Sequence, residues 1–192
     1  MNFSKGRVRI VGGEYRSRLI RVAARPGLRP TPDRVRETLF NWLGQDLSGM
    51  ACLDLFAGSG ALGFEAASRG AARVVMIEAD RATLKALESS RAALGASQVE
   101  IVGAQAEAYL ARARERFDVV FLDPPFRQNA VPMLLARLPA LLQKGARVVA
   151  EADRPVEAAP PWRELKRARA GGVSYQLFDW SGHDPSGVSG NV

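Results

Sequence analysis

Predicted strands and helices alternate along most of this chain, and this alternation restricts its fold more than any other feature. From Ala51 onward, short apolar runs rich in β-forming residues are followed by segments whose apolar residues recur every three or four positions. The expected strands are 51–56, 73–77, 99–102, 117–122 and 147–151, and the expected helices are 61–69, 81–94, 106–115 and 130–142. Such alternation predicts an α/β fold, in which a parallel sheet carries helices on both faces.

The two ends of the chain depart from this pattern. Residues 162–170 and 173–178 are separated only by two glycines, so we expect a hairpin that completes the sheet with an antiparallel strand pair. Near the start, Val8–Val11 and Leu19–Val22 are predicted to pair as a second, smaller hairpin.

A short helix is expected between the first hairpin and the sheet. Thr31 is a good N-cap, Pro32 suits the first helical position, and apolar residues recur at helical spacing through Asp33–Leu43. We therefore expect residues 1–30 to form a basic β-rich extension and residues 31–180 the main domain. The tail from 181 to 192 is expected to be disordered.

The positive charge is concentrated at the start of the chain. Residues 1–50 contain ten Lys and Arg against four Asp and Glu, so they account for six of the seven net positive charges of the whole chain. Such a segment attracts a polyanion; the alternative is a solvated basic face without a partner. The candidate contacts with such a polyanion are Arg7, Arg9, Arg16, Arg18, Arg29, Arg34 and Arg36. Arg34 and Arg36 fall outside the apolar stripe of their helix, so both are expected to be exposed.

Residue counts exclude several kinds of site. Cys52 is the only cysteine and His183 the only histidine, which argues against a disulfide, a zinc site or a histidine-based catalytic triad within one chain. No apolar run approaches 18 residues, so we expect a cytoplasmic protein without a membrane span or a metal.

A glycine-rich turn follows the first predicted strand of the sheet. Gly58, Gly60 and Gly63 satisfy the G-x-G-x-x-G pattern, which lets a ligand approach the backbone at a helix N-terminus. Asp54 lies just before the turn, and Glu78 ends the next strand, where it can accept both ribose hydroxyls of a nucleoside. Asp54 can pair with the cationic part of S-adenosylmethionine but would oppose a pyrophosphate, so it favours S-adenosylmethionine over a dinucleotide. The alternatives are a loop-bracing role for Asp54 and a solvated strand end at Glu78.

The third strand is followed by Gln105, which could contact an adenine ring or could be an exposed amide at a helix start. The predicted cofactor contacts are Asp54, Phe56, Gly58, Gly60, Glu78, Ala79, Gln105 and Ala106.

The segment Asp123-Pro124-Pro125-Phe126 follows the apolar strand 117–122. The prolines fix the backbone and lack N–H donors, so the carbonyls and the Asp123 carboxylate form a rigid acceptor set. Phe126 offers a ring for stacking. This combination suits a planar group that bears an NH2, such as a nucleobase; the alternative is a strand-ending turn with an incidental acid.

With these motifs, the chain resembles the RsmD family of bacterial methyltransferases, which modify the N2 amino group of a guanine in 16S ribosomal RNA. The resemblance covers about Arg9 to Phe178 and is most specific at 29–40. Its markers are Arg9–Gly13 (RIVGG), Arg29–Phe40 (RPTPDRVRETLF), Leu53–Gly63 (LDLFAGSGALG) and Asp123–Phe126 (DPPF).

The resemblance implies a class I methyltransferase: a seven-stranded, Rossmann-like sheet with a reversed hairpin at its end, S-adenosylmethionine as cofactor and Asp123–Phe126 as the catalytic segment. It also implies 16S ribosomal RNA as partner, within an assembling or assembled small subunit. A monomer is the default expectation. Many related enzymes carry an acidic residue or Asn near position 105, whereas this chain has Gln there.

Other functions share some of these motifs. An amino-group methyltransferase of DNA or RNA adenine or cytosine needs the same acceptor segment, and a protein-glutamine methyltransferase is a further relative. From other classes, a nicotinamide-dependent oxidoreductase would use the three glycines, and a non-catalytic RNA-binding module would use the basic segment.

Overall fold

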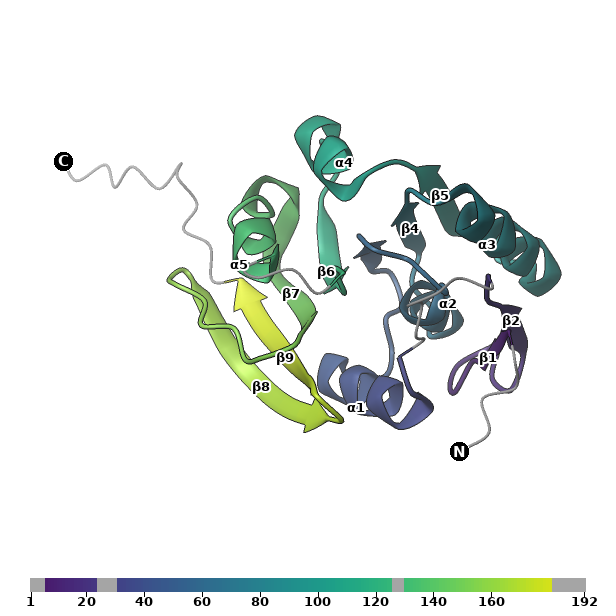
Figure 1. Ribbon diagram of the computed structural model, residues 1–192, viewed down its shortest axis with the longest axis horizontal. Coiled ribbons are helices and arrows are strands. Elements are labelled where there is room, and N and C mark those ends of the chain that lie inside the picture. Colours follow the sequence, from purple (N-terminus) through teal and green to yellow (C-terminus); the bar gives the residue numbers. More distant parts are fainter. Residues whose placement is uncertain (1–5, 24–30, 126–129, 181–192) are drawn as a thin grey trace.

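The computed structural model describes residues 6–23, 31–125 and 130–180 of the chain. Figure 1 shows the small N-terminal hairpin, one helix and then the alternating strands and helices. The strands are β1 (Arg7–Arg9), β2 (Leu19–Arg21), β3 (Ala51–Asp54), β4 (Arg73–Glu78), β5 (Val99–Gly103), β6 (Phe117–Leu122), β7 (Leu142–Ala152), β8 (Trp162–Ala170) and β9 (Val173–Trp180). The helices are α1 (Asp33–Leu43), α2 (Ala61–Ser68), α3 (Arg81–Leu94), α4 (Ala106–Arg112) and α5 (Ala130–Leu135), with a 3₁₀ turn at Pro139–Leu141.

The main sheet has seven strands in the order β5-β4-β3-β6-β7-β9-β8. Strands β3 to β7 run parallel to one another, whereas β9 pairs antiparallel with both β7 and β8. The expected α/β fold, with its mostly parallel seven-stranded sheet and reversed hairpin at the end, is therefore confirmed.

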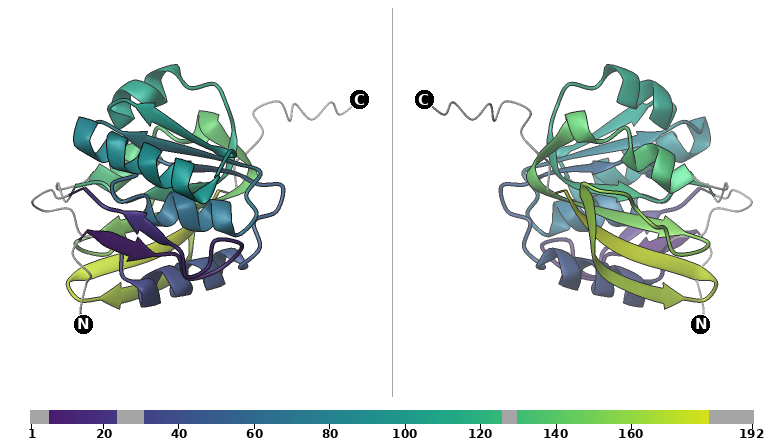
Figure 2. Two further views of the ribbon diagram at one scale, coloured as in Figure 1. Left: turned by 90° about the vertical axis from the view of Figure 1, so that its right-hand side faces the viewer. Right: turned by 90° about the vertical axis from the view of Figure 1, so that its left-hand side faces the viewer.

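Two apolar cores lie on the two faces of this sheet. Helices α1, α2 and α3 pack on one face against side chains such as Val119 and Phe121. Helices α4 and α5 pack on the other face against side chains such as Val120 and Leu122. Because side chains alternate between the faces of a strand, a buried strand contributes to both cores. The two layers can be followed in the side views of Figure 2.

The N-terminal hairpin packs against the main domain. Strands β1 and β2 pair with Val8 opposite Ile20, and both side chains are buried together with Ile10 and Tyr15. All four belong to the same core as α1, α2 and α3. The inner face of the hairpin therefore completes the covering of one sheet face.

Some expected boundaries were wrong. Helix α1 has Pro32 at its N-cap without a side-chain cap, so Thr31 does not have the expected capping role. The apolar stretch 130–142 forms a six-residue helix and a 3₁₀ turn instead of one helix. Pro139 lacks the N–H that a continuing helix requires, and Leu142 begins β7 by pairing with Phe117. Helix α4 ends at Arg112, before the expected residue 115.

Candidate active site

The predicted site residues collect at the carboxyl ends of the parallel strands. Strand β3 lies between β4 and β6, so the loops that follow these three strands meet at one edge of the sheet. The chain passes from β3 to β4 on one side, whereas β6 adds on the other side. This change of direction between β3 and β6 is the position at which open α/β sheets bind ligands.

The loop after β3 has the close-packed geometry of a ligand-binding turn. Gly60 is the N-cap of α2 with φ +78°, and an added Cβ would lie 2.7 Å from atoms of Leu87 and Phe64. Gly58 also has a positive φ, of +49°. Both conformations strongly favour glycine, and at Gly60 a side chain would also collide with the core, so the tight turn at the start of α2 requires these residues.

Asp54, the last residue of β3, holds this loop in place by a hydrogen bond. Its Oδ2 accepts a hydrogen bond from the Gly63 N–H at 3.0 Å, and its side chain is buried. Burial and the nearby charge of Asp123 raise the pKa of Asp54 to about 7, against the opposing effect of N–H groups of Gly63 and Phe56. The structure thus shows the loop-bracing role, whereas direct contact of Asp54 with a cofactor cation stays a prediction.

Glu78 joins the loops that follow β3 and β4. Its Oε2 accepts from the Gly58 N–H at 3.0 Å, and its Oε1 accepts from the N–H groups of Ala79 and Asp80, both at 2.8 Å. The backbone carbonyl of Glu78 also accepts from the Ala104 N–H, which brings in the loop after β5. Glu78 remains partly exposed beside the glycine turn, the position that a ribose ligand requires.

The remaining predicted cofactor residues surround this edge of the sheet. Gln105 is exposed at the N-cap of α4 and makes no side-chain capping bond, so its amide is accessible. Ala106 is buried, Ala79 is exposed and Phe56 is half-buried. Their contact with a cofactor stays a prediction.

Asp123 directly follows β6, the strand on the other side of β3 from β4. Its side chain is partly exposed, and burial raises its pKa to about 6. Among the described residues, no side chain or backbone group forms a hydrogen bond or ion pair with this carboxylate. Pro124 is buried and Pro125 exposed, whereas Phe126 lies outside the described residues. The site therefore presents a carboxylate whose acceptor oxygens are not used by the described part of the chain.

Glu151, which the sequence analysis missed, is a second acid at this edge. It lies near the end of β7, and its cross-strand partner on β9 is Tyr175. Burial and the charge of Asp123 raise the pKa of Glu151 to about 8. Its Oε2 is buried without a hydrogen-bond partner in the described part of the chain. The only sequence signal was an acidic residue at the end of a predicted strand.

One cavity borders Glu151, and a second lies between α1 and the last hairpin. One, of about 250 Å³, borders Pro124, Pro125 and Glu151 and is completed by the start of α5 and residues 152–157. The other, of about 430 Å³, lies between α1 and the β8–β9 hairpin and includes Arg34, Trp42 and Tyr175 in its lining. Both volumes are in or near the range of small-molecule pockets.

Most of the predicted basic contacts lie on the surface. Arg7, Arg9, Arg16 and Arg34 are exposed, and Arg7 lies directly opposite Arg21 in the hairpin. Arg29 lies outside the described residues.

Arg18 is exposed but already holds part of the fold. Its guanidinium donates to the carbonyls of Ala93 and Leu94, the latter at 3.3 Å. These carbonyls end helix α3, so Arg18 acts as a C-terminal cap of that helix.

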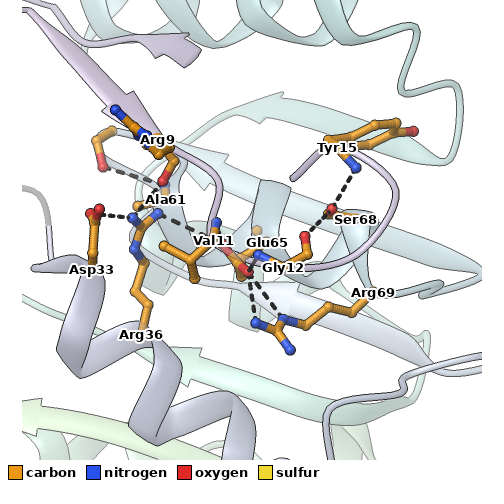
Figure 3. A network of polar contacts seen from close by, with 12 residues as sticks. Arg9, Val11, Gly12, Tyr15, Asp33, Arg36, Ala61, Glu65, Ser68 and Arg69 are labelled. Atoms are coloured by element: carbon orange, nitrogen blue, oxygen red, sulfur yellow. Dashed lines mark hydrogen bonds and ion pairs between the residues drawn. The ribbon is translucent and has the colours of Figure 1, made fainter. Parts of the chain in front are cut away.

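The expectation that Arg36 is exposed and binds RNA was wrong, because its side chain is completely buried (Figure 3). Its Nη2 donates to the Arg9 carbonyl at 2.6 Å and to Asp33 Oδ1 at 2.7 Å, and its Nη1 lies 3.8 Å from Glu65 Oε2. The hairpin and α2 pack against the polar side of α1, which lies outside its apolar stripe. Arg36 therefore anchors these elements to one another.

Within residues 6–23, 31–125 and 130–180, no group of three or more His, Cys, Asp or Glu side chains is arranged to hold a metal ion. No helix in the same ranges is long and apolar enough to cross a membrane.

Comparison with known proteins places the chain among methyltransferases. A family model described as conserved hypothetical protein 95 matches residues 8–179. The ribosomal RNA small subunit methyltransferase D of Escherichia coli strain K12 is 42% identical over 182 residues, which cover 90% of each chain. The protein of the same name from Haemophilus influenzae is 40% identical and covers 91% of this chain and 95% of its own.

Solved structures agree with these relatives. A proposed methyltransferase from Escherichia coli matches with a TM-score of 0.84 and 40% identity, over 93% of this chain and 100% of that one. An RNA methyltransferase from Salinibacter ruber, in complex with S-adenosyl-L-homocysteine, is similar in fold at a TM-score of 0.63 and 22% identity, over 82% of this chain and 97% of its own.

Proposed function

Since the chain belongs to the family of ribosomal RNA small subunit methyltransferase D, we propose that it transfers a methyl group from S-adenosylmethionine to the N2 amino group of a guanine in 16S ribosomal RNA. The observation that carries this proposal is the accessible Asp123 carboxylate, which two prolines follow and which lies beside the glycine turn. A cofactor bound on the turn and an amino group held at Asp123 would meet over the boundary between β3 and β6.

The residues at the ends of β3, β4 and β5 fit S-adenosylmethionine. Glu78, which already accepts from the Gly58 N–H, is proposed to accept the ribose hydroxyls, and the cofactor is proposed to approach the backbone at the glycine turn. Asp54 lies beneath the turn, and because its pKa is raised to about 7, only its ionised fraction would add negative potential for a cationic cofactor. The cofactor supplies a methyl group that is already activated on a sulfonium, so the protein mainly has to position the acceptor.

Asp123 prepares the acceptor nitrogen. The lone pair of a guanine amino group is delocalised into the ring, which makes the group a poor nucleophile. Hydrogen bonds from its two N–H groups to the Asp123 carboxylate and the Pro124 carbonyl favour a more tetrahedral nitrogen, with the lone pair directed at the methyl. As the new bond forms, the nitrogen becomes positive, and the Asp123 carboxylate stabilises that charge until one N–H proton is lost; the cofactor would leave as S-adenosylhomocysteine. Phe126 is proposed to stack on the base, which must first leave its own stack.

The outer face of the N-terminal hairpin is proposed to bind the RNA backbone. Arg7 and Arg21 are cross-strand neighbours, and like charges in this arrangement destabilise a hairpin. No ion pair with an acidic side chain compensates either guanidinium within the described part of the chain. A phosphate backbone would neutralise both charges and, with them, Arg9, Arg16 and Arg34. We expect the partner to be a small ribosomal subunit in the cytoplasm and the enzyme to act as a monomer.

Methyl incorporation into unmethylated 16S ribosomal RNA tests this function. Labelled S-adenosylmethionine is supplied with free RNA or with small subunits, and the products are identified by nucleoside analysis. We expect N2-methylguanosine and at least a 100-fold lower rate for Asp123→Asn, with unchanged cofactor affinity by calorimetry. The matched control is Glu107→Gln, an exposed acid on α4. Methylated adenosine or cytidine in place of N2-methylguanosine would refute the proposal, as would full activity of Asp123→Asn.

A further inference from the structure

Glu151 lies on the acceptor side of the proposed active site. In the sheet order, β6 separates β7 from β3, whereas the cofactor loops follow β3, β4 and β5. Leu122 of β6 pairs with Ala150 of β7, so Asp123 and Glu151 each directly follow a paired position. Neighbouring parallel strands are about 4.8 Å apart, which brings the two acids side by side at the edge of the sheet.

The Glu151 carboxyl group has no structural partner among the described residues. Oε2 is buried and has no hydrogen-bond partner among the described residues, and no ion pair involves this side chain there. The residue borders the 250 Å³ cavity together with Pro124 and Pro125 of the catalytic segment. A buried polar atom that is left unpaired destabilises the fold, so its retention at this position suggests a ligand contact.

The hydrogen-bonding edge of guanine fits a carboxyl group at this place. Beside its amino group, guanine carries the N1–H donor and then the O6 acceptor. Adenine and cytosine instead carry a ring nitrogen that only accepts next to their amino groups. If Asp123 holds the amino group, an acceptor beside it satisfies guanine and leaves the ring nitrogen of adenine or cytosine unpaired.

We infer that Glu151 recognises the N1–H and O6 edge of the target guanine, with its carbonyl oxygen accepting from N1–H and its hydroxyl donating to O6. This inference rests on the proposed function and adds to it the residue that selects guanine among the amino-bearing bases. Glu151 is thus a specificity residue beside the catalytic Asp123.

The electrostatics of the cluster support a neutral carboxyl group. The pKa of about 8 keeps Glu151 protonated at neutral pH, because burial and the Asp123 charge both disfavour a second negative charge. The neighbouring titratable or charged groups are Asp123 after β6, Tyr175 on β9, Arg34 on α1 next to Tyr175, and Asp153, Arg154 and Glu157 around the cavity. Above pH 8, Glu151 ionises and can no longer donate to O6.

The test compares two acceptor bases in the same RNA. Once nucleoside mapping has located the methylated position, ligated 16S RNAs carry either guanine or 2-aminopurine there. The analogue keeps the amino group but lacks both N1–H and O6. We expect the parent to prefer guanine by about 10- to 100-fold in kcat/KM, the usual effect of leaving buried hydrogen-bonding groups unpaired.

Two substitutions separate recognition from packing. Glu151→Leu is expected to reduce the preference to within about threefold, mainly through lower kcat/KM on guanine. Glu151→Gln is expected to keep the preference for guanine, because an amide, like a neutral carboxyl group, offers one acceptor and one donor. Above pH 8 the parent's preference should decline but persist, because an ionised Glu151 still accepts from N1–H while it loses the bond to O6, whereas the preference of Glu151→Gln should not change. Cofactor affinity by calorimetry is expected to stay constant, and Glu107→Gln serves as the control.

The outcomes distinguish this inference from the proposed function. If the parent methylates guanine and Glu151→Leu keeps the parent preference, the role of Glu151 is wrong and the proposed function stands. If Glu151→Leu does not fold, the test uses Glu151→Gln. The inference is then overturned if the guanine preference of this variant declines above pH 8 in the same way as the parent's. If the parent methylates no guanine at all, both fail together.

Discussion

Glu65 accepts a hydrogen bond from the backbone N–H of Gly12 at 2.8 Å, and this contact joins the loop of the N-terminal hairpin to helix α2. A second bond comes from the Val11 N–H at 2.9 Å. The same buried carboxylate lies against Arg69 at 2.9 Å and near Arg36 (Figure 3). One acid on α2 thus holds the hairpin loop, α1 and its own helix. The basic extension is fixed relative to the glycine turn from which α2 begins.

Removing the Glu65 carboxylate should therefore destabilise the whole domain. In Glu65→Ala, the buried Arg69 loses its anionic partner, the buried Arg36 keeps only Asp33, and two backbone N–H groups lose their acceptor. We expect the free energy of unfolding in urea to fall by about 3–5 kcal/mol. The exposed Glu107→Ala should change it by less than about 0.5 kcal/mol. Similar values for both variants would show that the network contributes little.

The arrangement of strands and helices could be predicted from the sequence because each buried strand and amphipathic helix has a local pattern. Which elements pack against the polar side of α1 could not be predicted. Arg36 falls outside the apolar stripe of α1, but its surroundings are set by Glu65, Arg9 and Asp33, two of which are far away in the sequence. Periodicity describes one helix and contains no information about what packs on its polar side.

The candidate site likewise contains residues that the sequence could predict and one that it could not. Asp54, Glu78 and Asp123 could be predicted because each lies in or just after the carboxyl end of a predicted strand, and parallel strands bring such positions together. Glu151 carries no motif of its own. Its importance appears only when β7 is placed next to β6, which gives it an acidic neighbour and a buried oxygen without a partner.

The raised pKa of Asp54 predicts a specific dependence of stability on pH. An unfolded Asp titrates near 3.9, and the folded one near 7, so between these values the folded protein retains a proton that the unfolded chain has lost. Stability must then fall as pH rises through this window. Asp54→Asn removes the titration, so its unfolding free energy relative to the parent should increase by up to about 1.4 kcal/mol per pH unit. Urea unfolding at pH 4.5, 5.5, 6.5 and 8 measures this, and a constant difference would contradict the buried, protonated state.

Methyl transfer should depend on the ionised form of Asp123. Because its pKa is raised to about 6, a large fraction of the carboxyl groups is neutral below that pH and cannot stabilise the developing positive charge. Single-turnover rates on 16S ribosomal RNA with saturating cofactor should rise about tenfold per pH unit well below pH 6 and level off above it. Asp123→Asn should give a low rate without this acidic limb. A parent rate that does not change between pH 5 and 7 would exclude a role for the ionised carboxylate.

The paired arginines of the hairpin predict how RNA affinity depends on salt. Neutralising two guanidiniums in Arg7→Gln/Arg21→Gln should lower the slope of log affinity against log salt by about 0.7 for each lost phosphate contact. The matched control is Arg163→Gln/Arg167→Gln on β8, whose guanidiniums already pair with Asp179 at 2.8 Å and Glu164 at 2.7 Å. Filter binding between 50 and 300 mM salt gives both slopes.

This pair of substitutions tests the hairpin more cleanly than its deletion. Removing residues 1–26 would expose the core around Ile10 and Ile20 and would take two N–H donors from Glu65, so lost RNA binding could follow from unfolding alone. The Gln variants change only exposed side chains and relieve a like-charge contact, so the unfolding free energy should stay equal or rise slightly. Cofactor affinity should also be unchanged. An unaltered salt slope in a folded, cofactor-binding double variant would show that the RNA lies elsewhere on the protein.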